Sequence, residues 1–364
     1  MEQPTYSGLR LAVVGPLPPP SGGMANQCQQ LLGLLRAEGA AVELVRTNSP
    51  YQPEWAGRIP VLRAFFRLLP YLWALWRASG RCQVMHVLAN SGWAWHLFAA
   101  PALWIARLRG APVIVNYRGG EAEPFFAAAP RHVHRTLAAA DALVVPSAFL
   151  DGVFRRFGFA PEVVPNIINL ERFGVPRTRT ADDAPHVVVT RNLEPIYDIP
   201  SVLAAFAAVR AALPAARLTV AGSGPELTRL QAMAADLGIA EAVTFAGRID
   251  NAQIPALYAA ADVMLNPSTV DNMPISILEA FASGVPVVST DVGGVPFIAE
   301  DGRTALLVPA RDPARMAEAM LRILRDRPLA ERLAAAARDE VKQYAWPVVR
   351  QKWLAVYRRL ARNR

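Results

Sequence analysis

The sequence has little cysteine and little histidine, and it has no Asp-x-Asp motif. Two cysteines, Cys28 and Cys82, are too few for a disulfide framework or a four-cysteine zinc site, and we expect both to be buried, reduced thiols. The five histidines form no ligand cluster beyond His132-x-His134, which we expect to be solvated, so no bound metal is expected. The N-terminus shows no basic segment followed by an apolar one, so export is not expected either.

A long uninterrupted apolar run is also missing. The best candidate for a membrane span, Cys82–Ala106, has no acidic or basic residue but contains histidine, asparagine, glycine and proline. Its pattern favours a strand over Val84–Leu88, a polar turn and a helix over Trp93–Leu108. That helix is shorter than the roughly 20 residues needed to cross a bilayer, so we expect no membrane-spanning segment.

The chain of 364 residues is instead rich in apolar side chains (53%) and carries a net charge of +8. Its length predicts two or three domains, each with its own core. Before residue 180 there are 18 basic and 10 acidic residues, whereas after it there are 20 of each. Residues 55–120 contain eight arginines, six tryptophans and no acidic residue, which indicates a localised basic and aromatic surface.

The segment Ile59–Arg81, read as a helix, places four arginines within about 80° of one another, with apolar side chains opposite. The arginines are Arg63, Arg67, Arg77 and Arg81, and the apolar side is Leu62, Phe65, Phe66, Leu69, Leu72, Trp73 and Trp76. The apolar side either packs on the domain core or enters the headgroup region of an anionic membrane, and we expect residues 58–109 to bind such a membrane surface. No nucleic-acid motif accompanies the charge, so no nucleic-acid partner is expected.

Short β-branched runs alternate with amphipathic stretches twice along the chain, which predicts two α/β domains with parallel sheets. The expected strands are Leu9–Val14, Ala41–Val45, Val84–Leu88, Pro112–Tyr117 and Ala142–Pro146, then His186–Thr190, Arg217–Ala221, Ala242–Ala246, Asp262–Asn266, Pro286–Ser289 and Ala305–Val308. We place the first domain at 1–175 and the second at 185–345, separated by the polar loop Pro176–Pro185. The amphipathic helix within 346–364 is expected to pack back on the first domain.

Two glycine motifs follow expected strands. Gly22-Gly23 precedes a helix, an arrangement that suits a phosphate or sugar cradle and suits an ordinary tight turn equally well. Gly222-Ser-Gly224 resembles half of a dinucleotide fingerprint, but Leu227 stands where the third glycine belongs. An NAD site is therefore disfavoured.

The densest polar motif runs from Pro267 to Gly294. Asp271 lies in the loop after an expected strand, and Glu279 lies in the second turn of a helix that begins near Pro274. Glu279 is thus placed to accept hydrogen bonds from vicinal hydroxyls such as those of a ribose, although two acids at this spacing are also typical of a solvated surface pair.

Taken in order, these motifs resemble those of the retaining glycosyltransferases of family 4. The matching segments are Gly22-Gly23, Val144-Val-Pro-Ser147, Val164-Pro-Asn166-Ile-Ile-Asn-Leu-Glu-Arg-Phe173, Arg191, Ala221-Gly-Ser-Gly-Pro225, Phe245-Ala-Gly-Arg248, and Asp271 to Glu279 through Gly293-Gly294. They extend along nearly the whole chain, and their order and spacing are specific. The resemblance implies an α/β fold of the GT-B type, with two facing Rossmann-like domains, an interdomain cleft and a C-terminal crossover helix.

The resemblance also implies roles for individual residues. Arg191 would hold the donor diphosphate, Glu279 the nucleotide ribose, and Asp271 the transferred sugar. Gly22 and Gly23 would lie near the donor and acceptor phosphates. The remaining donor-binding positions are Asn166, Gly222, Gly224, Asn272, Met273, Pro274 and Ile275.

The chain departs from the family pattern around these positions. No lysine follows Arg191, since the only lysines are Lys342 and Lys352, so arginine, helix dipoles and backbone N–H groups must neutralise the diphosphate. Asn116-Tyr-Arg118 stands where the family often has a histidine. We expect Arg118 to be a catalytic residue that supplies a positive charge in place of that histidine.

Two acidic positions of the family also differ. Asp271 replaces a glutamate, and Phe297 stands where a glutamate commonly follows the second glycine pair. These departures are compatible with altered sugar contacts or with a decayed enzyme. We favour altered contacts, because Arg191, Glu279 and both glycine pairs are retained.

We therefore expect a metal-independent, retaining glycosyltransferase without a cofactor. It would move a sugar from a nucleotide-sugar donor to a glycan or lipid-linked acceptor in cell-surface polysaccharide biosynthesis. Its expected location is cytoplasmic, peripheral on the inner face of the plasma membrane. A nucleotide-sugar epimerase of the GT-B fold and a non-catalytic nucleotide-sugar-binding protein remain the alternatives.

Overall fold

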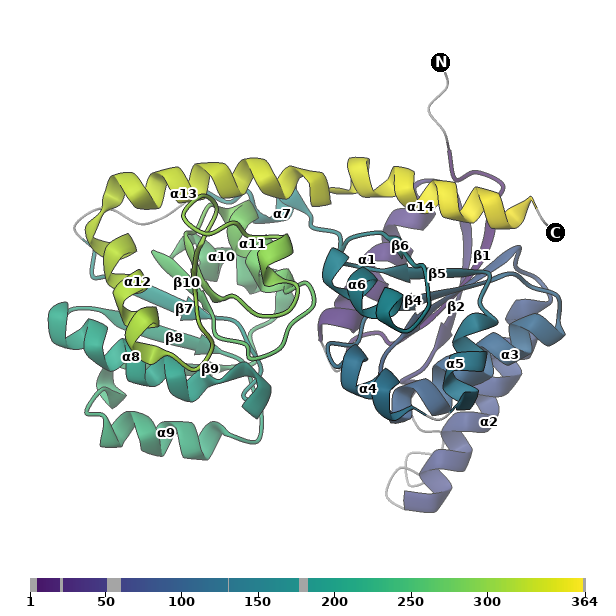
Figure 1. Cartoon of the computed structure of the whole chain (residues 1–364), viewed down its shortest axis with the longest axis horizontal. Coiled ribbons are helices and arrows are strands. Elements are labelled where there is room, and N and C mark those ends of the chain that lie inside the picture. The colour runs from purple at the N-terminus through teal and green to yellow at the C-terminus, as the bar shows by residue number, and fades with distance from the viewer. Residues whose placement is uncertain (1–4, 20–21, 51–59, 130, 177–182, 363–364) are drawn as a thin grey trace. The chain divides into compact units, whose positions relative to one another are not determined.

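The computed structural model describes residues 5–19, 22–50, 60–129, 131–176 and 183–362, with only the backbone for residues 60–65. The chain divides into two compact units, Met1–Ile167 with Trp346–Arg364, and Ile168–Ala345. Each unit is built on its own parallel six-stranded sheet with helices on both faces (Figure 1). The prediction of two Rossmann-like α/β domains is confirmed.

The segment after Ile167 belongs to the second unit, although we expected the first domain to continue to residue 175. The backbone N–H of Ile168 donates to the carbonyl of Tyr344 (3.0 Å), and Phe173, in the short helix α7 (Leu170–Phe173), is buried in the second unit's core. Local sequence does not reveal such contacts between distant residues. The loop Pro176–Pro185, where we expected the boundary, lies largely outside the described residues.

The first sheet has the strand order β2-β1-β3-β4-β5-β6. Its strands are β1 (Arg10–Gly15), β2 (Ala41–Arg46), β3 (Val84–Ala89), β4 (Val113–Tyr117), β5 (Ala142–Val145) and β6 (Glu162–Val163). The helices are α1 (Gly23–Ala37), α2 (Pro60–Ser79), α3 (Ala100–Leu108), α4 (Ala122–Ala128), α5 (Arg131–Ala138), α6 (Ala148–Arg156) and α14 (Trp346–Ala361), and a π-helical segment η2 (Trp95–Ala99) precedes α3. The sequence did not predict β6, whose two residues are too few to show a periodicity.

Alternate residues of the central strands enter two separate cores. Leu11 and Val13 of β1 join the cluster that contains α1 and α14, whereas Ala12 and Val14 join the cluster that contains α2 and α3. Every residue of β3 and β4 is buried, as expected for parallel strands covered on both faces.

The C-terminal helix α14 is bonded to the first unit by polar groups as well as by apolar packing. Arg350 donates to Glu38 of α1 (2.9 Å), and the buried hydroxyl of Tyr357 lies 2.6 Å from Nδ1 of His86 in β3. The amide of Asn116 lies 3.0 Å from Nε2 of His86, so that nitrogen accepts and Nδ1 donates to the tyrosine. Burial lowers the pKa of His86 to about 3, so the ring is neutral.

The second sheet has the strand order β12-β11-β10-β7-β8-β9. Its strands are β7 (His186–Val189), β8 (Arg217–Ala221), β9 (Val243–Gly247), β10 (Val263–Asn266), β11 (Val287–Thr290) and β12 (Leu306–Val308). The longer helices are α8 (Ile199–Ala212), α9 (Leu227–Asp236), α10 (Ile254–Ala259), α11 (Ile275–Ser283), α12 (Pro313–Arg325) and α13 (Arg327–Glu340). In both sheets all strand pairs are parallel.

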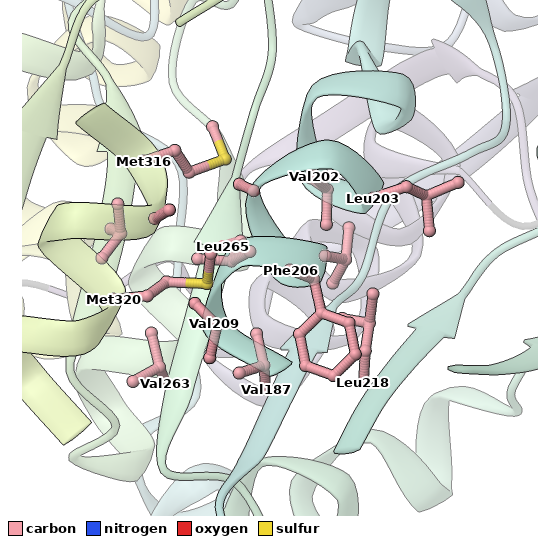
Figure 2. Packing of buried hydrophobic residues seen from close by; sticks show 14 of the residues in the cluster. Val187, Val202, Leu203, Phe206, Val209, Leu218, Val263, Leu265, Met316 and Met320 are labelled. Atoms are coloured by element: carbon pink, nitrogen blue, oxygen red, sulfur yellow. The ribbon is translucent and has the colours of Figure 1, made fainter. Parts of the chain in front are cut away.

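One face of the second sheet is covered by α8 and α12. Figure 2 shows Phe206 and Val209 of α8 packed over Val187 and Leu218, with Met320 of α12 beside them. The opposite face buries Val188, Met264 and Val287 against α10 and α11. This double cover holds the sheet rigid, so the loops at its carboxyl edge start from fixed positions.

The exposed aromatic residues of α2 and α3 form the surface that the sequence indicated, but α2 does not have a single apolar side. Tyr71, Leu75 and Ala78 are buried in the core, whereas Trp73 is 61% exposed and Leu69 and Trp76 are also exposed. The core therefore covers a different side of α2 from the predicted apolar side, whose described residues are exposed or half-buried. Residues 51–59 and the side chains of residues 60–65, including Arg58, Leu62, Arg63 and Phe65, lie outside the described residues.

Other expectations from the composition can be checked directly. Cys28 and Cys82 are buried and free, as predicted. The prediction of a solvated His132-x-His134 is wrong for His134, whose ring stacks on Phe159 with centroids 6.0 Å apart. Over the described part of the chain, no helix combines the length and the apolarity that crossing a bilayer requires.

Candidate active site

The strand order of the second sheet reverses between β7 and β10, which are paired neighbours. In open α/β sheets, ligands bind outside the carboxyl ends of the strands at such a reversal, because the two outgoing loops diverge there. The loop after β7 carries Arg191 and the loop after β10 carries Asp271. Two residues that the sequence placed 80 positions apart thus meet at one edge.

Arg191 and Asp271 form an ion pair. Nη2 of Arg191 donates to Oδ2 of Asp271 at 2.6 Å, and the two side chains are only 12% and 14% exposed. Nε of Arg191 donates to the Oδ1 of Asn266, the last residue of β10, at 2.8 Å. A guanidinium held by two acceptors keeps a fixed orientation, so its remaining N–H groups point in defined directions.

A buried network of hydroxyls and amides supports this pair from below. The amide of Asn266 donates to Ser289 Oγ of β11 (2.9 Å), and Ser268 Oγ donates to Oδ2 of Asp271 (3.3 Å). Thr290, at the end of β11, donates to the carbonyl of Ser268 (2.6 Å). Two adjacent strands, β10 and β11, thereby fix the loop that carries Asp271.

Tyr197 lies beneath Arg191, where the family pattern led us to look for a lysine. The guanidinium carbon of Arg191 is 5.2 Å from the centroid of the tyrosine ring. Tyr197 ends a single 3-10 turn, η3 (Pro195–Tyr197), and burial raises the pKa of its hydroxyl, so it stays neutral. The ring therefore supplies a cation–π contact rather than a second positive charge.

Glycines let the loops around Arg191 approach one another. A Cβ on Gly222 would lie 1.9 Å from the carbonyl oxygen of Arg191, and a Cβ on Gly224 would lie 2.2 Å from that of Leu193. The backbone N–H of Leu193 donates to the carbonyl of Ser223 (3.1 Å). Gly222 and Gly224 thus hold the loop after β7 against the loop after β8, and α9 begins at Leu227.

The second glycine pair has the same function on the other side of the site. Gly293 has φ +55°, and a Cβ there would lie 2.1 Å from the carbonyl oxygen of Asp271. A Cβ on Gly294 would lie 1.6 Å from the carbonyl oxygen of Asn272. The N–H of Gly294 donates to the Asp271 carbonyl (2.9 Å), so this loop holds the backbone of the segment that leads into α11.

Asn272, Met273 and Pro274 precede α11, and Ile275 is its first residue. Asn272 and Met273 are buried, and Pro274 has the extended conformation of an N-cap. Met273 packs in the core beside Ile277, which anchors the start of the helix. The N-terminus of α11 therefore lies directly beyond Asp271.

Glu279 lies one turn into α11. The hydroxyl of Tyr258 donates to its Oε2 at 3.3 Å. Burial raises the pKa of Glu279 to about 7, although the charge of Arg172 and the bond from Tyr258 oppose that rise. A carboxyl of this kind changes its charge near neutral pH.

The other predicted residues lie in the first unit. Arg118 follows β4, and its Nη1 donates to Oδ1 of Asn166 at 2.6 Å. Burial lowers the pKa of Arg118 to about 10, so it remains charged at neutral pH. Gly22 is the N-cap of α1 with extended backbone, Gly23 is the first residue of that helix, and a Cβ on Gly22 would meet no atom within 4 Å.

Asn266, Tyr197 and Tyr258 also contact the site residues, and they were not among the residues predicted from the sequence. Asn266 carries a signal that could have been used, since it is a polar residue that ends an otherwise apolar buried strand at the carboxyl edge of a parallel sheet. The two tyrosines carry none, because their contacts with Arg191 and Glu279 depend on the folded loops.

The sequence matches two family models. Residues 21–172 match the model described as Glycosyltransferase Family 4, and residues 175–340 match the model described as Glycosyl transferases group 1. The chain belongs to the group 1 glycosyltransferases of the GT-B fold.

Similar proteins are found among curated sequences and solved structures. The chain is 28% identical to a GDP-mannose-dependent alpha-(1-6)-phosphatidylinositol monomannoside mannosyltransferase of Mycobacterium tuberculosis, over 94% of this chain and 96% of that protein. It is 27% identical to a phosphatidyl-myo-inositol mannosyltransferase of Mycobacterium leprae, over 93% and 94%. Sucrose-phosphate synthase from Thermosynechococcus elongatus has the same fold, with a TM-score of 0.78, 22% identity and 98% and 100% coverage. So does Anabaena HepE in complex with UDP and glucose, with a TM-score of 0.73, 17% identity and 96% and 99% coverage.

Proposed function

We propose that this group 1 glycosyltransferase is a retaining enzyme that moves a sugar from a nucleotide-sugar donor to a lipid-linked or glycan acceptor in cell-surface polysaccharide biosynthesis. The observation that carries the proposal is the Arg191–Asp271 ion pair at the carboxyl ends of β7 and β10. The full-length similarity to GDP-mannose-dependent and phosphatidyl-myo-inositol mannosyltransferases supports a nucleotide-sugar donor and a lipid acceptor.

The residues of the second unit have distinct roles in this proposal. Arg191 binds the donor diphosphate with the N–H groups that Asp271 and Asn266 leave available. Asp271 both orients Arg191 and contacts the transferred sugar. Glu279 accepts hydrogen bonds from the ribose, and the start of α11 faces the donor with backbone N–H groups.

In the first unit we assign Gly22, Gly23, Asn166 and Arg118 to substrate binding. The space that a side chain at Gly22 would fill is open, and the extended backbone there is available to any residue. A glycine that the packing of the protein does not require supports close approach of a phosphate to the backbone. Arg118 supplies a half-buried positive charge beside Asn166.

The chemical step follows from these charges. As the donor bond breaks, negative charge develops on the leaving diphosphate, and Arg191 stabilises it without moving. The acceptor hydroxyl then attacks the oxocarbenium-like sugar from the face that the diphosphate leaves and passes its proton to an oxygen of that diphosphate, so the configuration is retained without a protein nucleophile. We propose that no divalent metal takes part, since Arg191 and helix N-termini supply the positive charge.

The configuration of the product tests this mechanism. Proton NMR coupling constants of the isolated product should show the same anomeric configuration as the donor sugar, in reactions carried out with EDTA. A product of inverted configuration would contradict the attack from the leaving-group face. Loss of activity in EDTA that magnesium restores would contradict the metal-independent step.

Donor binding is the first experiment, because it needs no acceptor. Thermal unfolding is followed with UDP, GDP, dTDP, CMP and NAD. We expect one nucleoside diphosphate to stabilise the protein, by about 2.7 kcal/mol at 100 times its Kd, and NAD to have no effect. Glu279→Ala should abolish the stabilisation. No response to any nucleotide would overturn the donor site, and binding without turnover of any sugar donor would favour a non-catalytic binding protein.

The same titration has a predictable pH dependence. Ribose hydroxyls donate to a carboxylate, so only ionised Glu279 binds them, and its pKa is about 7. Nucleotide affinity should therefore rise about tenfold between pH 6 and pH 8, as the ionised fraction rises from roughly one-tenth to nine-tenths. The unliganded protein should change in the opposite sense, because a carboxyl pKa raised by folding lowers stability as pH increases from about 4.5 to 7. Glu279→Gln should remove the rise in affinity that exceeds the nucleotide's own titration.

We further propose that the enzyme acts at the cytoplasmic face of the plasma membrane, bound through the surface of α2, α3 and the loop before η2. Trp93 is 78% exposed there, and Trp73, Trp104 and Leu108 are exposed with it. Arg77, Arg107 and Arg109 supply exposed positive charge on the same helices. Arginines beside tryptophans suit an anionic lipid surface.

Sedimentation with liposomes tests the membrane proposal. The protein should pellet with vesicles that contain phosphatidylglycerol at low salt, and less with neutral vesicles. Trp73→Ser with Trp93→Ser should reduce pelleting several-fold. Phe297→Ser, which removes an exposed aromatic ring from the second unit, is the matched control and should pellet like the unchanged protein. Absence of lipid-dependent pelleting would end this proposal.

A further inference from the structure

A pocket lies in the first unit, between η2, α3 and α5. Its volume is about 410 Å³. Ala100 and Pro101 line its apolar part, and His96, Trp104, His132 and Arg135 supply its rings and its charge. Apart from Trp104, which belongs to the surface proposed to face the membrane, these residues have no role assigned above.

The backbone at this pocket is irregular. Trp95–Ala99 is π-helical, a conformation that is rare and that is found frequently at functional sites. It directly precedes α3 and carries His96 on the pocket wall. The small side chain of Ala100 and the ring of Pro101 follow, so α3 begins without a bulky residue to fill the space.

The tryptophan wall is held in place although it is half exposed. Trp104 is 50% exposed, and its indole N–H donates to Oγ1 of Thr136 on α5 (3.1 Å). The hydroxyl of Thr136 in turn donates to the carbonyl of His132 (2.8 Å). The two helices are thereby tied together across the pocket, and the Trp104 ring keeps one orientation.

The polar side of the pocket is basic. The rings of His96 and His132 lie with centroids 5.7 Å apart, and Trp93 and Phe125 each approach His96 at 6.3 Å. Arg135 is exposed and forms no ion pair with any of the described residues. Among the described residues, no acidic side chain lines the pocket.

We propose that this pocket binds the phosphate group of the lipid acceptor, with Arg135 and the two histidines on the phosphate and Trp104 against the hydrocarbon or sugar next to it. Arginine and imidazole N–H groups match phosphate oxygens, and an indole face matches an apolar or ring-shaped neighbour. Trp93 and Trp104 belong both to this pocket region and to the surface proposed to face the membrane. A phosphate held here therefore keeps its hydrocarbon chain directed toward the lipid. This inference rests on the proposed function, and it identifies the phosphate group as the part of the acceptor that the pocket binds.

Isothermal titration of the full chain with geranyl phosphate, geraniol and inorganic phosphate tests the proposal. We expect saturable binding of geranyl phosphate, and much weaker binding of the other two. Arg135→Gln should weaken geranyl phosphate about tenfold or more, and adding His132→Gln should weaken it further, since charge-assisted hydrogen bonds are lost. Arg131→Gln is the matched control, because Arg131 is exposed on the same helix and does not line the pocket.

Three results would overturn the proposal. Equal affinity for inorganic phosphate and geranyl phosphate would make the pocket a site for free phosphate. If Arg131→Gln weakened geranyl phosphate binding as much as Arg135→Gln, the binding would be explained by general charge attraction. If Arg135→Gln left the affinity for geranyl phosphate unchanged, the pocket would not be its binding site. The nucleoside diphosphate titration of the same variants distinguishes failure of this proposal from failure of the proposed function. If the proposed donor site is wrong, no nucleotide stabilises the unchanged protein. If only the lipid-phosphate site is wrong, the nucleotide still stabilises it.

Discussion

Replacing Arg191 by alanine is expected to lower the rate of donor turnover about 100- to 1,000-fold, the effect typical of removing one donor that stabilises developing charge. Arg191 is the positive charge at the carboxyl ends of β7 and β10, and its orientation is fixed by Asp271 and Asn266. Release of nucleoside diphosphate from the donor identified by thermal titration measures the effect. Arg191→Lys should recover only part of the rate, because an ammonium cannot donate in two fixed directions.

Removing the ion pair should also lower the stability of the protein, an effect that can be measured separately from turnover. Arg191→Ala leaves Asp271 without its partner at a site only 14% exposed, so we expect a loss of about 1–3 kcal/mol. The double variant Arg191→Ala with Asp271→Ala should recover much of that stability but none of the turnover. Arg217→Ala, at the amino end of β8, removes the same charge from the opposite edge of the sheet and serves as the control. Full turnover in Arg191→Ala would contradict its role.

Gly294→Ala is expected to have the largest effect on the shape of the site. Its Cβ would lie 1.6 Å from the carbonyl oxygen of Asn272, a backbone atom that cannot move without displacing the start of α11. We expect a loss of roughly 3 kcal/mol, a decrease in Tm of roughly 6–12 °C and loss of nucleotide stabilisation. Thermal unfolding with and without the nucleoside diphosphate measures all three.

A glycine without such a neighbour provides the comparison. Gly33, in the middle of α1, has no atom within 4 Å of an added Cβ, so Gly33→Ala should leave the protein unchanged or up to about 1 kcal/mol more stable. If Gly294→Ala kept both its Tm and its nucleotide response, the interlocking of the loops would not be required for the site.

The alternation of strands and helices could be predicted from the sequence, because parallel strands are buried on both faces and appear as short β-branched runs. Residues such as Val187–Val189 and Val287–Val288 show this pattern, and they lie in β7 and β11. The side of α2 that packs on the core could not be predicted. Tyr71 and Trp73 lie on opposite sides of the helix, and the core covers the side with Tyr71 rather than the more apolar side with Trp73, because the position of the neighbouring helices decides which side is covered.

Part of the candidate site could be predicted from the sequence. Arg191, Asp271 and Glu279 were identified by their place in ordered motifs, and the glycine pairs by their position after strands. Asn266 and Tyr197 were not, because each acts through Arg191, which is 75 residues from Asn266 along the chain. The shifted pKa of Glu279 was not readable either, since it depends on burial that only the packed helix provides.

The sequence by itself determined the class of fold, the positions of the strands and the family motifs, because hydrophobic periodicity and glycine placement are local properties. The tertiary structure alone decided the order of the strands within each sheet. That order brings β7 beside β10, so Arg191 pairs with Asp271. The tertiary structure also assigns residues 168–173 to the second unit. The physical reason is that hydrogen bonds and burial between distant segments depend on which surfaces meet after folding, and a local pattern does not specify its partner.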